Sequence, residues 1–161
     1  MNSSPGSVIV LFLLFGGNNG DTVTQTEGQV TLSEGAFLTV NCSYETTGYP
    51  VLFWYVQYSH EGLQLLLKAT KAKETGSNKS FEATYNKETS SFHLKKASVQ
   101  ESDSAVYYCV LGSRYSSSNT RLIFGQGTTL QVKPDIQGSD PAVYQLRGSK
   151  SSNISVCLFT D

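Results

Sequence analysis

Apolar and polar residues alternate in short runs along most of the chain after residue 20. In the run 37–42, for example, Leu38, Val40 and Cys42 fall on one face, which is the period of a half-buried β-strand. No stretch of ten or more residues keeps a helical apolar period, and we expect only a short helical turn at 98–102. We predict about nine strands, at residues 29–32, 37–42, 52–58, 63–69, 80–85, 91–94, 105–111, 120–124 and 128–133. This number and spacing of strands indicate an all-β sandwich.

Two cysteines, a tryptophan and a tyrosine refine that prediction. Trp54 follows Cys42 by twelve residues, and Tyr107 precedes Cys109 by two. A disulfide between the sheets of an immunoglobulin-type sandwich needs one cysteine on each sheet. A tryptophan packs against the bridge, and a tyrosine two residues before the second cysteine ties a corner with its hydroxyl. We therefore predict an immunoglobulin V-type β-sandwich with a Cys42–Cys109 disulfide, whose function lies in its loops and on one sheet face.

The same alternation predicts which residues face away from the core. Because Tyr107 and Cys109 point inward, Tyr108 points outward, and because Trp54 points inward, Tyr55 points outward. The outward set is expected to be Tyr55, Gln57, Leu63, Leu65, Tyr108 and Phe124. Such a face is too apolar for water and indicates pairing with another variable domain. The alternative is that the linker or a second domain covers it.

Charge argues against one class of partner. The net charge is −1 over 161 residues, and only 16% of the residues are charged. Nucleic-acid binding needs a concentrated basic patch. Lys68, Lys71 and Lys73 alternate with uncharged residues and are expected to lie on a solvated strand or loop. We therefore expect no nucleic-acid partner.

The residue pattern does not indicate catalysis or metal binding. His60 and His93 are the only histidines, and neither lies near a cysteine or carboxylate cluster at metal-ligand spacing. A Ser-His-Asp site needs a concave pocket, and nothing in the pattern predicts one. Gly125 and Gly127 are expected to form a bulge at which the last strand leaves the sheet edge and pairs across a dimer. We expect no enzyme, no cofactor and no metal site.

The two ends of the chain differ from its middle. Residues 8–15 form an apolar run of eight, too short to cross a bilayer but typical of a signal-peptide core, so we expect a cleaved signal at 1–20. No later segment is long enough for a membrane anchor. Pro134 begins a linker, and two further strands are expected at 142–146 and 154–159. Cys157 on the second of them is expected to be the first half of another sandwich disulfide.

Several segments together resemble a known family. They are Cys42 with Trp54-Tyr55-Val56-Gln57, Asp103-Ser104-Ala105-Val106-Tyr107-Tyr108-Cys109, and Phe124-Gly125-Gln126-Gly127-Thr128. They resemble an antigen-receptor variable domain with its joining segment. Residues 140–146 and 155–161 are similar to the start of the T-cell receptor α constant domain. This favours a T-cell receptor α chain over an antibody light chain or a V-type adhesion or co-receptor domain.

The resemblance implies a domain organisation and a role. Residues 1–20 would be the signal peptide, 21–133 the variable domain, and 134–161 a linker and the truncated start of the α constant domain. The chain would pair with a T-cell receptor β chain and bind peptide–MHC complexes on the extracellular side of the plasma membrane. It would contact signalling subunits of the receptor through constant and membrane regions beyond this sequence.

The antigen-binding loops are implied by position at 46–51, 70–75 and 110–123. The contact residues would be Thr47, Tyr49, Lys71, Lys73, Arg114, Tyr115 and Ser116. Arg114 and Tyr115 are the expected anchors, because Arg and Tyr supply large contact areas and directional hydrogen bonds in such loops.

Three structural expectations complete the sequence-based account. The resemblance implies a buried ion pair of Asp103 with a basic residue, for which Lys79 is the nearest candidate. Ser59-His60 stands where the family usually has Pro-Gly, so the following turn is expected to be altered. Asn41 and Asn78 fit the Asn-x-Ser glycosylation pattern, and Asn78 is preferred because it is expected in a loop. Asn2 and Asn153 fit the pattern too.

Overall fold

The larger layer of the fold is a six-stranded sheet, seen in a computed structural model that describes residues 20–116, 118–135, 144–147 and 155–158. Its strands lie in the order β2 (Gly28–Ser33), β12 (Thr128–Lys133), β10 (Ala105–Ser116), β5 (Tyr49–Gln57) and β6 (Gln64–Ala69), and β11 (Asn119–Phe124) also pairs with β10. β2 and β12 run parallel, and the other pairs are antiparallel.

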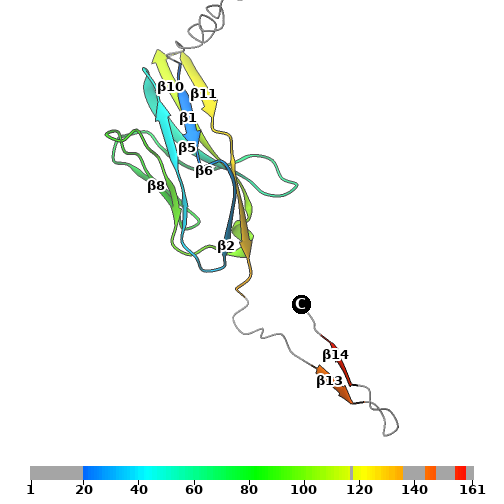
Figure 1. Ribbon diagram of the computed structural model, residues 1–161. Helices are drawn as coiled ribbons and strands as arrows, with labels where there is room; N and C mark the ends of the chain where they lie inside the picture. The colour runs from blue at the N-terminus through cyan, green and yellow to red at the C-terminus, as the bar shows by residue number, and fades with distance from the viewer. Residues whose placement is uncertain (1–19, 117, 136–143, 148–154, 159–161) are drawn as a thin grey trace, which may run out of the picture.

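The smaller layer packs against the larger one across a single hydrophobic core (Figure 1). Its four strands are β3 (Leu38–Val40), β9 (Leu94–Lys96), β8 (Phe81–Thr84) and β7 (Thr75–Asn78). β1 (Thr22–Gln25) pairs with β4 (Cys42–Glu45), and a 3-10 turn, η1, covers Glu101–Asp103. The expected all-β immunoglobulin V-type sandwich is confirmed.

The predicted disulfide, tryptophan and tyrosine occupy the centre of the core. Cys42 and Cys109 form the disulfide, with their Cα atoms 6.3 Å apart. Trp54 is fully buried, and its indole N–H donates to the Phe92 carbonyl at 2.9 Å. The buried Tyr107 hydroxyl donates to the Asp103 carbonyl at 2.6 Å, and burial raises the pKa of that hydroxyl. In the chain-entropy model a crosslink over 67 residues contributes about 4 kcal/mol.

Two strands were not predicted, and one predicted strand divides. The run 37–42 becomes β3 and β4 because the backbone changes partner at Asn41. The Asn41 N–H donates to Thr26 Oγ1 at 3.1 Å, and its carbonyl accepts from the Thr26 N–H at 3.0 Å. β3 therefore pairs with β9, whereas β4 pairs with β1, the first unpredicted strand. The second is β7, whose sequence Thr-Gly-Ser-Asn has the composition of a turn.

A close backbone approach explains β7. A Cβ at Gly76 would lie 2.6 Å from the Lys68 carbonyl oxygen, so glycine lets β7 lie directly against the backbone of β6. Tertiary packing thus overrides a local turn composition. The expected strand at 91–94 is instead β9, which begins at Leu94, and the helical turn expected at 98–102 is the short η1.

The two glycines after Phe124 do not direct the strand away from the sheet, so that prediction was wrong. β11 and β12 both pair with β10, and residues 125–127 form a break between them. The Gly125 N–H donates to the Cys109 carbonyl at 2.8 Å, and a Cβ there would collide with the Gln25 side chain. Gly127 has φ of +90°, and a Cβ there would lie 2.7 Å from the Tyr108 ring.

The structure describes only part of the two ends of the chain. Two further strands are present: β13 (Tyr144–Arg147) pairs antiparallel with β14 (Ser155–Leu158). The signal-peptide core, most of the linker from 136 to 143, Asn2 and Asn153 lie outside the described residues, as does the side chain of Cys157. The division into signal, variable and constant segments therefore stays a prediction.

Candidate functional site

The outward face of the six-stranded sheet carries the residues that alternation predicted. On β10 and β5, Tyr108 stands opposite Tyr55, and Tyr55 also stands opposite Leu65 on β6. Tyr55, Gln57 and Tyr108 are half-buried, while their inward neighbours Trp54, Val56, Tyr107 and Cys109 are buried. Leu63, Leu65 and Phe124 are 44%, 48% and 46% exposed. We call this set, with the residues added in the next paragraph, the outer face.

Three further apolar residues extend the outer face toward one end of the domain. Val110 stands opposite both Phe53 on β5 and Phe124 on β11, and it is fully buried although it lies outside the core cluster. The Tyr55 ring lies 6.0 Å from the Phe53 ring and 6.2 Å from the Phe124 ring. Leu122 on β11 is 52% exposed. The same alternation that identified Tyr55 and Tyr108 would have identified Phe53, Val110 and Leu122.

The expected residues of the first loop and of the third loop lie at the end of the sandwich where β10 and β11 form a hairpin, with Arg114 opposite Tyr49. Figure 1 shows the start of β1 beside the end of β10 and the start of β11 there. Tyr49 is the first residue of β5 and is 80% exposed. The other expected contacts are all exposed as well: Thr47, Lys71, Lys73, Arg114, Tyr115 and Ser116. The structure therefore leaves each of these side chains open to a ligand.

The third loop is more regular than its Gly, Ser and Asn content predicts. β10 extends to Ser116 and β11 begins at Asn119, with Arg114 opposite Thr120 and an irregularity between Arg114 and Ser116. Backbone pairing therefore supports most of this segment, which we call the third hairpin. The second loop is also held in place, because the Glu74 carboxylate accepts from the Thr70 N–H at 2.7 Å and the Lys71 N–H at 2.9 Å. These backbone hydrogen bonds lower the pKa of Glu74.

A polar network that the sequence did not reveal joins the first loop to the third hairpin. Thr46 Oγ1 donates to the Asp21 carboxylate at 2.6 Å and lies 2.7 Å from the buried Ser113 hydroxyl. The Tyr115 hydroxyl donates to the other Asp21 oxygen. Burial acts to raise the pKa of the Asp21 carboxyl, but these hydrogen bonds and the charge of Arg121 outweigh it and leave that pKa below its ordinary value.

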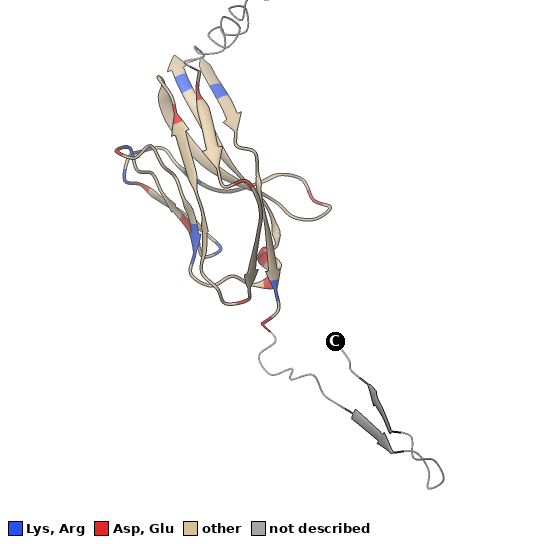
Figure 2. Cartoon of the chain, in the orientation of Figure 1, with Lys and Arg blue, Asp and Glu red and all other residues tan. Residues whose placement is uncertain are grey.

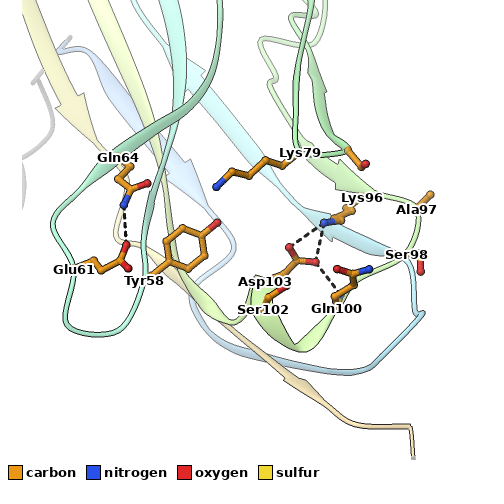
Figure 3. Close-up of a pocket in the computed structure, with 11 residues that line it drawn as sticks. Tyr58, Glu61, Gln64, Lys79, Lys96, Ala97, Ser98, Gln100, Ser102 and Asp103 are labelled. Carbon is orange, nitrogen blue, oxygen red and sulfur yellow. Dashed lines mark hydrogen bonds and ion pairs between the residues drawn. The ribbon is translucent and has the colours of Figure 1, made fainter.

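The partner of Asp103 is Lys96, so the expectation of Lys79 was wrong (Figure 3). The Lys96 ammonium lies 2.8 Å from the Asp103 carboxylate and 4.5 Å from the centre of the Phe81 ring. The Asp103 carboxylate also accepts from the Gln100 N–H at 2.8 Å. Lys79 lies over the Tyr58 ring instead, at 5.4 Å. Lys96 ends β9 beside Asp103, whereas Lys79 lies in the turn between β7 and β8, elsewhere along the same groove.

The groove in Figure 3 lies around the Lys96–Asp103 ion pair. It has a volume of about 810 Å³, and its most buried charges, Lys96 and Asp103, neutralise each other. Among the described residues, no group of three His, Cys, Asp or Glu side chains is placed to hold a metal ion.

Figure 2 shows Lys and Arg dispersed over the coloured elements, in keeping with the dispersed charge of the sequence. Among the same described residues, no helix is long and apolar enough to cross a membrane.

The two glycosylation candidates differ in their surroundings. Asn78 was expected in a loop, but it is the last residue of β7, and its side-chain N–H donates to the Leu66 carbonyl at 2.9 Å. Asn41 is exposed at the junction of β3 and β4, and within the described part of the chain its side chain makes no hydrogen bond to another residue. The structure therefore favours Asn41 as the more accessible of the two.

Comparison with known proteins agrees with the class that this geometry defines. A sequence model described as the immunoglobulin V-set domain matches residues 25–133, and a second, described as a domain of unknown function, matches residues 141–161. The first match covers all the strands of the sandwich except the first three residues of β1. The structure and this match define the class as a V-set immunoglobulin domain.

Individual relatives narrow the class to one family. The chain is 71% identical to human T cell receptor alpha variable 9-2 over 111 residues, which cover 69% of this chain and 99% of that protein. It is 49% identical to the mouse T-cell receptor alpha chain V region CTL-F3 over 136 residues, covering 83% of this chain and all of that one. It is 42% identical to the human T cell receptor alpha chain MC.7.G5 over 142 residues, which is 87% of this chain and 50% of that one. The chain belongs to the T cell receptor alpha family.

Membership of this family fixes the general role. The relatives are receptor chains rather than enzymes, and their variable domains serve antigen recognition on the extracellular side of a membrane receptor that has further chains. The family also accounts for the Cys42–Cys109 disulfide and for the variable-type sandwich around it.

Proposed function

We propose that this chain pairs with a T-cell receptor β chain through the outer face and binds peptide–MHC complexes with the loop end of the same domain. The observation that carries the proposal is the outer face itself. Leu65 and Phe124 are close to half exposed beside an aromatic cluster, on a sheet whose other face is the buried core. Exposed apolar surface of this extent marks an interaction site in a soluble domain.

The chemistry of the outer face fits a second variable domain. Burying the exposed halves of Leu65 and Phe124 would contribute about 1 kcal/mol each, from the transfer of apolar side chains out of water. Tyr55 and Tyr108 add aromatic surface with hydroxyl groups, which is the composition of interface cores. The Gln57 amide donates one N–H to the Glu61 carbonyl at 3.2 Å. Its oxygen and its second N–H remain for an equivalent glutamine on the partner.

A pair of matched variants tests the pairing. Leu65→Arg places a charge within the outer face, whereas Thr39→Arg places it at an exposed position on β3 of the other sheet. Leu65→Arg is expected to weaken binding of a β-chain variable domain at least about tenfold, as at an interface hot spot, and Thr39→Arg is expected to leave it unchanged. Equal affinities for both variants, measured by titration calorimetry, would remove the outer face from the interface.

The proposed antigen contacts are the exposed residues of the loop end. Arg114 and Tyr115 on the third hairpin are the anchors, with Tyr49, Thr47 and Ser116 beside them. Lys71 and Lys73 on the second loop complete the set. Arg114→Ala is expected to weaken binding to a cognate peptide–MHC complex about tenfold or more without changing β-chain affinity, because a truncated hot-spot side chain affects only the surface that it contacts. Binding screened over a panel of peptide–MHC complexes, with β-chain affinity measured in parallel, provides the test.

The remaining proposals concern the environment of the domain. We assign residues 1–20 to a signal peptide, 21–133 to the variable domain and 134–161 to a linker and the start of the α constant domain, with the chain on the extracellular side of the plasma membrane. Signalling subunits are expected to contact regions beyond this sequence. Asn41 and Asn78 are the proposed glycosylation sites. Loss of one glycan mass from secreted protein in Asn41→Gln, but not in Asn78→Gln, would place the sugar at Asn41 alone.

A further inference from the structure

Both oxygens of the Asp21 carboxylate are bound by residues of different loops. One oxygen accepts from the Thr46 hydroxyl of the first loop at 2.6 Å. The other accepts from the Tyr115 hydroxyl of the third hairpin. Asp21 immediately precedes β1 and is 94 residues from Tyr115 in sequence, so this contact depends on the tertiary fold. The ribbon in Figure 1 brings the start of β1 beside the ends of β10 and β11.

The direction of each hydrogen bond in this network follows from the available protons. Thr46 has one hydroxyl proton, which goes to Asp21, because a carboxylate can only accept. Thr46 Oγ1 must therefore accept from the Ser113 hydroxyl at 2.7 Å and from the Gly48 N–H at 3.0 Å. Ser113 therefore donates to Thr46, Thr46 donates to one oxygen of Asp21, and Tyr115 donates to the other oxygen. Every hydroxyl proton of the network is thus committed to one acceptor.

Close packing holds the first loop against the third hairpin at the same point. A Cβ at Gly48 would lie 2.6 Å from Ser113 Oγ and 2.9 Å from the Arg114 carbonyl oxygen. Only a residue without a side chain allows this approach, since real Cβ atoms essentially never show contacts below 3.0 Å. Ser113 is itself fully buried. The first loop and the third hairpin therefore form one packed unit, and Asp21 closes it from the β1 side.

We propose that Asp21 is a positioning residue for antigen recognition, whose carboxylate holds Tyr115 and, through Thr46, the third hairpin in the conformation that contacts the ligand. This inference rests on the proposed antigen-binding function of the loop end. This inference also changes the proposed role of Tyr115. Its hydroxyl forms a hydrogen bond within the domain, so its ring is the part of the side chain that would contact a ligand. Arg114 lies beside it with its side chain exposed and outside the network. A hairpin ordered before binding loses less conformational freedom when the ligand arrives.

The test combines a double-mutant cycle with amide hydrogen exchange, both on the heterodimer with a β chain. Tyr115→Phe removes only the hydroxyl, and Asp21→Ala removes its acceptor. Each single variant is expected to speed exchange of the third-hairpin amides and to weaken ligand binding about three- to tenfold, because the hairpin must then be ordered on binding. The double variant is expected to match Asp21→Ala rather than to multiply the two losses.

Matched controls separate positioning from general stability. Thr46→Val removes a hydroxyl of the network, whereas Thr47→Val removes an exposed hydroxyl of the neighbouring residue with no hydrogen bond in the described structure. Only Thr46→Val is expected to speed exchange in the hairpin, with exchange in the core strands unchanged in both. Asp21→Asn keeps an oxygen for Tyr115 and an N–H toward Thr46, and it is expected to recover part of the loss.

Two results would overturn the proposal. One is unchanged hairpin exchange in Asp21→Ala. The other is an affinity loss from Tyr115→Phe that is equally large with and without Asp21, since the hydroxyl would then contact the ligand directly. The exchange measurement needs no ligand, so coupled effects of Asp21 and Tyr115 on exchange would support the network even if no peptide–MHC complex bound. That outcome would contradict the proposed antigen-binding function alone.

Discussion

Gln25→Ala is expected to be among the most destabilising single substitutions in this domain, because its side chain completes the sheet at a break. One edge of β10 pairs with β11 from Val110 onward and with β12 up to Tyr107, so it has no strand partner between these two residues. The Gln25 amide occupies that gap. Its Oε1 accepts from the Cys109 N–H at 3.0 Å, and its Nε2 donates to the Tyr107 carbonyl at 2.9 Å. It also donates to Thr128 Oγ1 at 2.9 Å, and the side chain is buried.

The magnitude follows from the groups left behind. Alanine would leave the Cys109 N–H and the Tyr107 carbonyl without these partners in the interior, whereas the Thr128 hydroxyl would still donate to the Thr26 carbonyl. A buried polar group without a partner costs about 1–3 kcal/mol, so the two groups together destabilise the fold by about 4 kcal/mol. That is a large part of the stability of about 5–15 kcal/mol that a domain of this kind has.

Urea denaturation of the variable domain measures this loss directly, with Gln29→Ala as the matched control. Gln29 is exposed, and its amide donates to the Gln131 side chain at 2.6 Å on the surface. Its removal is expected to change the free energy of unfolding by less than about 0.5 kcal/mol. A loss below about 1 kcal/mol for Gln25→Ala, or a loss equal to that of Gln29→Ala, would refute the argument that Gln25 satisfies the break in the sheet.

Three further predictions concern stability. Asp103→Ala should destabilise the fold by about 3–5 kcal/mol in urea denaturation, since it leaves the Lys96 ammonium buried without its partner; a loss under 1 kcal/mol would contradict the ion-pair reading. His60 adopts φ of +60°, a left-handed conformation that costs a non-glycine residue about 1 kcal/mol. His60→Gly should therefore raise the free energy of unfolding by about that amount and raise the thermal midpoint, and an unchanged midpoint would show that the turn carries no strain. Burial and the charge of Lys95 lower the pKa of His93 below its ordinary value of 6.5, and neutral His93 Nδ1 accepts from the Cys42 N–H at 3.0 Å. The folded state therefore binds this proton less readily than the unfolded state, and stability that is complete above pH 6.5 should fall as the pH drops through the folded-state pKa. His93→Asn should lose less stability than the parent between pH 7.5 and 5.5, and parallel pH profiles would exclude His93 as the cause.

Alternation along the strands predicted the core and the outer face because it reports a property of single strands. Once Trp54 and Cys109 were assigned to the interior, the period of two placed Tyr55 and Tyr108 on the other side. Burial agrees at each of these positions. Phe53 and Leu122 were within reach of the same reasoning, since they obey the same period on β5 and β11.

The contacts that escaped prediction depend on how strands and loops assemble in the folded domain. Asp103 pairs with Lys96, seven residues before it, because β9 ends beside η1, whereas the expected partner Lys79 lies over the Tyr58 ring. Asp21 and Tyr115 are 94 residues apart, and their contact depends on how β1 lies against β10 and β11. A sequence gives the chemical type of each residue and its period, but partner choice across sheets depends on the assembled fold.

The central claim is that the outer face is a pairing surface for a β-chain variable domain. Sedimentation velocity of the variable domain alone, and then with an equimolar β-chain variable domain, tests it most directly. The domain alone is expected to self-associate or aggregate at high concentration because its apolar face is uncovered, and the mixture is expected to sediment as a single one-to-one heterodimer. A monodisperse monomer at high concentration, whose sedimentation does not change when the β-chain domain is added, would contradict the claim.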